Sequence, residues 1–113
     1  MTDYRLPACT RIKHREEISR VFEQGRKKSD AMMTLFGVAN ERGYSRFCVA
    51  VGSRFGGAVQ RNRAKRLCRE AFRLTRHELP AGWDFCVLPR AGAELTLEKL
   101  QRSLATLTRR VAE

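Results

Sequence analysis

Residues 60–73 read QRNRAKRLCREAFR, a run in which six cations stand against the single acid Glu70. The glycine pair at 56–57 interrupts the apolar segment before the run, and Pro80 follows soon after it. Glycine and proline are typical of helix boundaries, so the sequence predicts one long helix over about 58–78.

This predicted helix has a packing face and a basic face. Each residue turns a helix by about 100°. One side therefore carries the small and apolar residues Ala64, Leu67, Cys68, Ala71 and Leu74. The other side carries Asn62, Lys65, Arg66, Arg69, Arg73 and Arg76.

The basic face repeats like charges where an ordinary solvated face would mix them. Lys65 and Arg69 are four residues apart, as are Arg69 and Arg73, and each such pair costs about 0.2 to 0.5 kcal/mol. A solvated face remains the alternative. The repulsion favours a bound polyanion, since the planar guanidinium group suits phosphates.

Composition points the same way. A chain of 113 residues suffices for one domain, spanning 1–113, with one modest core. A net charge of +11 beside 42% apolar residues indicates a folded protein with a polyanionic partner, nucleic acid ahead of a membrane surface. No apolar run approaches the roughly 18 residues of a membrane span, and the N-terminus does not resemble a signal peptide. We therefore expect a cytoplasmic protein.

The cysteines suggest neither a metal site nor a disulfide framework. They are Cys9, Cys48, Cys68 and Cys86. None forms a metal-binding spacing with another cysteine or with His14 or His77. Cys48 and Cys86 fall in apolar, strand-like runs, so we expect them to be buried, reduced thiols.

Before the basic helix, the sequence predicts a first helix and then a hairpin. In the segment 15–25, Ile18, Val21 and Phe22 recur at helical spacing, and Gly25 is placed to end the helix. The basic stretch 26–28 is expected to be a solvated loop. Segments 31–39 and 44–52 are strand-like and flank a four-residue turn, which predicts an antiparallel hairpin.

After the basic helix, residues 83–89 predict a buried strand and residues 96–111 a C-terminal helix. The apolar stripe of that last helix is Leu97, Leu100, Leu104, Leu107 and Val111. The order helix, hairpin, arginine-rich helix, strand and helix predicts a single layered α/β (α+β) domain.

Residues 55–72, FGGAVQRNRAKRLCREAF, resemble the signature segment of the protein subunit of bacterial ribonuclease P. The resemblance extends from about Arg11 to about Arg109. It implies a fold similar to the second domain of ribosomal protein S5, with a left-handed crossover through the arginine-rich helix. It also implies an accessory role, in which a catalytic RNA uses Mg²⁺ to hydrolyse one phosphodiester, releases the 5′ leader of precursor tRNA and leaves a 5′ phosphate.

The resemblance also implies roles for individual residues. The catalytic RNA and the nearby leader would be bound by Arg61, Asn62, Arg63, Lys65, Arg66 and Arg69, with Arg73 continuing the stripe. A cleft for the leader would include Ile18, Phe22, Phe36 and Arg54, because aromatic and apolar surfaces receive unpaired bases. Core packing is the open alternative for the two phenylalanines.

Three positions depart from the family pattern. Ile18 stands where an aromatic residue is common, and Ser53 stands where a lysine often precedes Arg54. Ala50 cannot supply a hydroxyl group. These departures bear on the individual leader contacts, and the sequence leaves open which cations contact the catalytic RNA and which contact the leader.

The chain itself carries no evident catalytic site. Nuclease chemistry would need clustered carboxylates or a histidine with a partner, whereas Asp3, Asp30 and Asp84 are scattered. We expect catalysis only as a subunit of a holoenzyme, with no metal held by the protein. The alternative is a small basic ribosomal-type RNA-binding protein. A helix-turn-helix DNA reader is disfavoured, since a strand precedes the glycine pair at 56–57.

Overall fold

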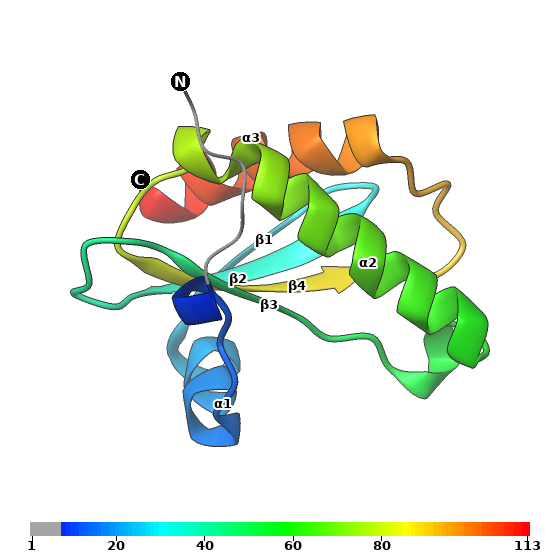
Figure 1. The fold of residues 1–113 in the computed structure, drawn as a ribbon, viewed down its shortest axis with the longest axis horizontal. Coiled ribbons are helices and arrows are strands. Elements are labelled where there is room, and N and C mark those ends of the chain that lie inside the picture. The colour runs from blue at the N-terminus through cyan, green and yellow to red at the C-terminus, as the bar shows by residue number, and fades with distance from the viewer. Residues whose placement is uncertain (1–7) are drawn as a thin grey trace.

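The computed structural model describes residues 8–113, so part of the N-terminal stretch considered above lies outside it (Figure 1). The helices are α1 (Arg15–Gln24), α2 (Ala58–Thr75) and α3 (Leu97–Ala112). Single 3-10 turns are η1 (Ala8–Thr10), η2 (Ser53–Phe55) and η3 (Arg76–Glu78). The strands are β1 (Arg26–Ser29), β2 (Met33–Ala39), β3 (Arg46–Val49) and β4 (Trp83–Pro89).

The sheet is the middle layer of the fold. Its strand order is β1-β2-β4-β3, with α2 and α3 on one face and α1 on the other (Figure 1). The strands β3 and β4 are parallel neighbours, and α2 forms the crossover between them. The predicted mixed α/β class is confirmed, as are the positions of the three helices.

The predicted hairpin between segments 31–39 and 44–52 is wrong in its pairing. β4 lies between β2 and β3, antiparallel to the first and parallel to the second. A turn signal fixes a chain reversal but not the hydrogen-bonding partner, and β4 takes the central place because Asp84–Val87 are buried on both faces. The antiparallel hairpin of this fold is β1–β2, where Lys27 lies opposite Phe36, so residues 26–28 form an exposed edge strand and not a loop.

The main core lies between the sheet and the pair α2 and α3. Phe47 of β3 stacks on Phe72 of α2 with ring centroids 4.4 Å apart. The C-terminal helix begins where Thr96 caps it, its side chain accepting from the Lys99 amide at 3.2 Å. Four of the five stripe residues of α3 are fully buried, namely Leu100, Leu104, Leu107 and Val111.

Gly37 of β2 allows α3 to lie close to the sheet. A Cβ added at this position would stand 2.7 Å from Cγ1 of Val111 and 3.0 Å from Cδ1 of Phe85.

We therefore expect Gly37→Ala to lower the free energy of unfolding by about 1 to 3 kcal/mol through overpacking. Denaturant unfolding measures this change. Gly43→Ala is the matched control, because nothing lies within 4 Å of its added Cβ, and it should change stability by less than about 0.5 kcal/mol. Equal effects of the two substitutions would contradict the close approach.

Candidate nucleic-acid interface

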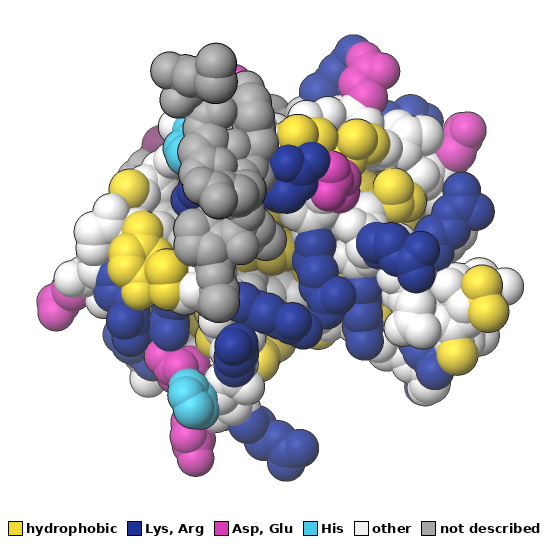
Figure 2. Space-filling model, viewed as in Figure 1, with side chains coloured by type: hydrophobic (Ala, Val, Ile, Leu, Met, Phe, Trp, Pro, Cys, Tyr) yellow, Lys and Arg dark blue, Asp and Glu magenta, His cyan; other side chains and the backbone are white. Residues whose placement is uncertain are grey.

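The helix α2 presents its basic face to solvent because its other face is fixed in the core. Ala64, Cys68 and Ala71 are fully buried, which leaves the intervening long cations outside. Burial raises the pKa of the Cys68 thiol to about 12, as expected for an inert core cysteine. Figure 2 shows Lys and Arg side chains gathered over the middle and right of this side of the molecule, around α2.

Two of the seven predicted RNA-binding residues on α2 hold the helix itself. Arg61 Nη1 donates to the Gly56 carbonyl at 2.8 Å, which ties the helix start to the glycine loop. Arg73 pairs with Glu70, its Nε donating at 3.0 Å, and this bond lowers the pKa of Glu70. Within residues 8–113, no hydrogen bond or ion pair engages the side chains of the other five, which are Asn62, Arg63, Lys65, Arg66 and Arg69.

A cavity of about 440 Å³ opens beside α2. Four segments line it: residues 10–13, α1, β3 and α2. Its apolar lining is Ile12, Ile18, Phe47, Cys48 and Val49, and its cations are Arg11, Lys13, Lys65 and Arg69. We call this the leader cavity for the ligand proposed below.

The cations of α2 fall into two sets. Lys65 and Arg69 line the leader cavity, whereas Arg63 and Arg66 border a separate hollow with Leu67 and Glu70. We call Arg63 and Arg66, with Leu67, the outer surface. Helical periodicity placed Lys65, Arg66 and Arg69 along one face, whereas the structure divides them between two hollows.

The predicted cleft residues are only partly brought together. Ile18 lines the leader cavity, whereas Phe22 and Phe36 do not. The two phenylalanine rings meet edge to face with centroids 5.0 Å apart, and Lys27 Nζ lies 5.9 Å from the Phe36 ring. Both rings remain partly exposed on the α1 side of the sheet, while Arg54 is exposed in η2. The aromatic pair therefore forms a surface near the cavity and not its wall.

Arg46 clamps α1 to the two strands beside the cavity, a role that no sequence motif indicated. Its Nε and Nη2 donate to the two Asp84 oxygens at 2.8 and 2.6 Å, and Nη2 also donates to Glu17 at 2.6 Å. Burial alone would raise the pKa of Asp84, but bonds from Arg46 and Asn40 hold it below its usual value. The Glu17 pKa is lowered mainly by the same Arg46 hydrogen bond.

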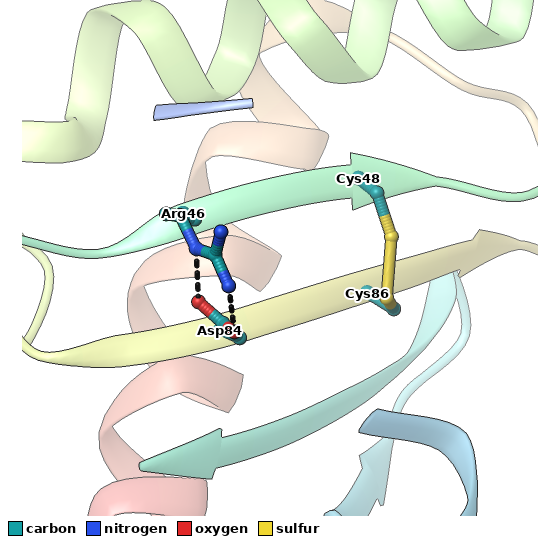
Figure 3. The surroundings of a disulfide bond; sticks show 4 residues. All are labelled: Arg46, Cys48, Asp84 and Cys86. Carbon is teal, nitrogen blue, oxygen red and sulfur yellow. Dashed lines mark hydrogen bonds and ion pairs between the residues drawn. A yellow bond between two sulfur atoms is a disulfide. The ribbon is translucent and has the colours of Figure 1, made fainter. Parts of the chain in front are cut away.

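The expectation of two reduced thiols at Cys48 and Cys86 is wrong, because the two form a disulfide (Figure 3). They are opposite residues of β3 and β4, with Cα atoms 4.8 Å apart, well within disulfide range. The pairing was hidden at the level of sequence because it depends on β4 lying next to β3. Cys9 and Cys68 are free.

Residues 11–13 are a further part of the site that sequence reasoning missed. Ile12 is buried and its amide donates to the Phe47 carbonyl at 3.1 Å, so this short segment runs beside β3. Arg11 and Lys13 flank it and are exposed. The alternation cation, apolar residue, cation is typical of an edge strand, and it was the signal available.

The exposed side chains of the site are suited to binding a polyanion. Across residues 8–113, no three His, Cys, Asp or Glu side chains gather as a metal-binding group. Nor does any helix in that range have the length and apolarity needed to cross a membrane. Free cations around apolar patches are what single-stranded nucleic acid requires, since phosphates follow the cations and bases rest on apolar surfaces.

Comparison with known proteins points to a single family. The family model described as Ribonuclease P matches residues 6–112. The ribonuclease P protein component of Photorhabdus laumondii is 38% identical over 97% of this chain and 93% of its own length. That of Pelotomaculum thermopropionicum is 32% identical over 88% of this chain and 89% of its own.

Solved structures agree with the fold. The ribonuclease P protein of Thermotoga maritima superposes with a TM-score of 0.80 at 27% identity, covering 89% of this chain and 96% of the other. The protein from Staphylococcus aureus gives a TM-score of 0.76 at 26% identity, with 92% and 95% covered.

Proposed function

Because this chain belongs to the ribonuclease P protein family and is a protein component of that tRNA-processing endoribonuclease, we propose that its two cationic surfaces serve two different RNAs. The leader cavity binds the single-stranded 5′ leader of precursor tRNA. The outer surface binds the catalytic RNA. The observation that carries the proposal is the division of the α2 cations between two hollows.

The leader cavity suits an unpaired strand. An apolar floor that includes Ile18 and Val49 offers a surface to a base, and Lys65 and Arg69 stand at its border for the phosphates. A base within a duplex is stacked and paired, so it cannot enter such a hollow. The exposed edges of Phe22 and Phe36 extend the apolar surface on the α1 side of the sheet. The cavity thus favours a substrate that carries a leader over a product that has lost it.

The outer surface suits a structured RNA. Arg63 and Arg66 are exposed on α2 and flank the partly exposed Leu67, with Asn62 one step away. Guanidinium groups on a rigid helix fit phosphate pairs in a fixed geometry. A large folded RNA presents such fixed phosphates, whereas a flexible leader does not.

In this proposal the catalytic RNA and its Mg²⁺ carry out the hydrolysis, and the protein supplies positive charge and leader binding. Two converging RNAs repel each other, and protein cations replace the counterions that would otherwise screen them. The protein acts in the cytoplasm, where the precursor tRNA is found. A ribosomal-type structural role would need only one RNA surface and no substrate cavity.

The purified protein should restore cleavage of precursor tRNA by a bacterial ribonuclease P RNA at low Mg²⁺, with the benefit shrinking as Mg²⁺ rises. The measurement is the single-turnover cleavage rate across a Mg²⁺ titration, with and without protein. A variant with Ala at Lys65, Arg69, Arg63 and Arg66 is the control and should restore little. A benefit that stays constant at every Mg²⁺ concentration would contradict the charge-screening role, and no restoration would favour the ribosomal-type alternative.

A further inference from the structure

The two cysteines of the disulfide differ in their exposure to solvent. Cys48 lines the leader cavity and is partly exposed, whereas Cys86 is fully buried beneath α1. We propose that Cys48 is a site of reversible modification by small anionic disulfides, and that Cys86 is the resolving cysteine that clears it. The effect on the leader rests on the function proposed above, while the thiol chemistry does not.

Geometry makes Cys86 the partner for any group attached at Cys48. The two residues lie directly opposite each other on parallel strands, so their side chains leave the sheet on the same face (Figure 3). Cys86 packs with Ile12 and Val21 in the small apolar cluster beneath α1, which shields it from solvent. A reagent from solvent therefore meets Cys48 first.

The surroundings of Cys48 select the reagent. Four cations line the same cavity, namely Arg11, Lys13, Lys65 and Arg69, and no Asp or Glu among residues 8–113 lines it. The charges that attract leader phosphates also attract small anions. The suited oxidant is a low-molecular-weight disulfide carrying carboxylates, of which glutathione disulfide is the common example.

The chemistry is two thiol–disulfide exchanges. Cys48 thiolate attacks one sulfur of the small disulfide, forming a mixed disulfide and releasing one small thiolate. The Cys86 sulfur then attacks the Cys48 sulfur, and the second small thiolate leaves and takes up the Cys86 proton. Two protein thiols are oxidised to one disulfide, and one small disulfide is reduced to two thiols.

The outcome for the cavity depends on the second exchange. A mixed disulfide would leave a negatively charged peptide among the cations that receive leader phosphates, and so would oppose leader binding. The Cys48–Cys86 bond adds no group to the cavity. Cys86 thereby keeps the cavity open under oxidising conditions.

The test compares holoenzymes in a Cys9→Ser background, because Cys9 is a free and exposed thiol. After reduction and then exposure to glutathione disulfide, the parent should carry no adduct, only the internal disulfide. Cys86→Ala should retain one tripeptide per chain at Cys48. Its affinity for precursor tRNA should fall about tenfold, the scale of losing one base contact, with mature tRNA unaffected and dithiothreitol restoring binding. Cys48→Ala should take no adduct.

Intact mass and tRNA affinity decide the outcome, with Cys86→Val as a second variant that refills the buried site. Absence of adduct on both Cys86 variants, or a stable adduct on the parent, would overturn the resolving role. An adduct that leaves precursor affinity unchanged would overturn the blocking step. The proposed function is tested separately, by whether the reduced parent prefers precursor over mature tRNA.

Discussion

Replacing Asp84 with Leu is expected to lower the free energy of unfolding by about 3 to 5 kcal/mol, because it leaves the Arg46 guanidinium buried without its bidentate partner. Only 9% of the Arg46 side chain and 3% of the Asp84 side chain are exposed, so water cannot replace the lost bonds. Equilibrium denaturation followed by circular dichroism gives the value.

The double substitution Arg46→Met with Asp84→Leu is the informative control. It removes both charges together, and buried pairs replaced by apolar residues of similar size often lose little stability. The double variant should therefore be clearly more stable than Asp84→Leu alone. A single substitution that costs less than about 1 kcal/mol would contradict the clamp.

The same carboxylate predicts how stability changes with pH. The Asp84 pKa is below its usual value of 3.8 in the folded protein, so the pair stabilises the fold above that pH. This contribution is lost as the pH falls through the lowered pKa and the carboxylate is protonated. Acid unfolding of the parent should therefore be steeper below about pH 4 than that of Asp84→Leu, and parallel curves would contradict the lowered pKa.

Lys65→Ala combined with Arg69→Ala should weaken holoenzyme binding of precursor tRNA by about 3 kcal/mol or more, at least a hundredfold in Kd. Each side chain is expected to make one charge-assisted contact with a leader phosphate, and each such contact contributes about 1.5 to 3 kcal/mol. Binding of mature tRNA should change little, because it lacks the leader.

Arg63→Ala combined with Arg66→Ala is the matched control, since it removes the same charge from the same helix. This variant should weaken assembly with the catalytic RNA and leave the preference for precursor over mature tRNA intact. If the two double variants lower precursor and mature binding equally, the division of α2 into two surfaces is wrong.

The helices and strands were largely predictable because their signals are local. The glycine pair at 56–57, the stripe of α3 and the apolar run of β4 each mark an element within a few residues. Strand pairing was not predictable in the same way. The turn after β2 is compatible with pairing to β3, and only the burial of β4 on both faces places it between them.

The same distinction between local and long-range features applies to the candidate site. The basic stripe of α2 was visible because helical periodicity is a property of one segment. The leader cavity was not, since it depends on how α2 lies against residues 10–13 and β3. The Arg46–Asp84 pair and the disulfide were missed for a related reason: both join opposite residues of β3 and β4, and this register exists only once the strand order is known.

Site-specific crosslinking tests most directly whether the two surfaces of α2 bind two RNAs. Arg69→Cys and Arg66→Cys, each in the Cys9→Ser background, would carry a photoreactive group at one position in the assembled holoenzyme with precursor tRNA. We predict that position 69 crosslinks to the 5′ leader and position 66 to the catalytic RNA. Crosslinks from both positions to the same RNA would contradict the account.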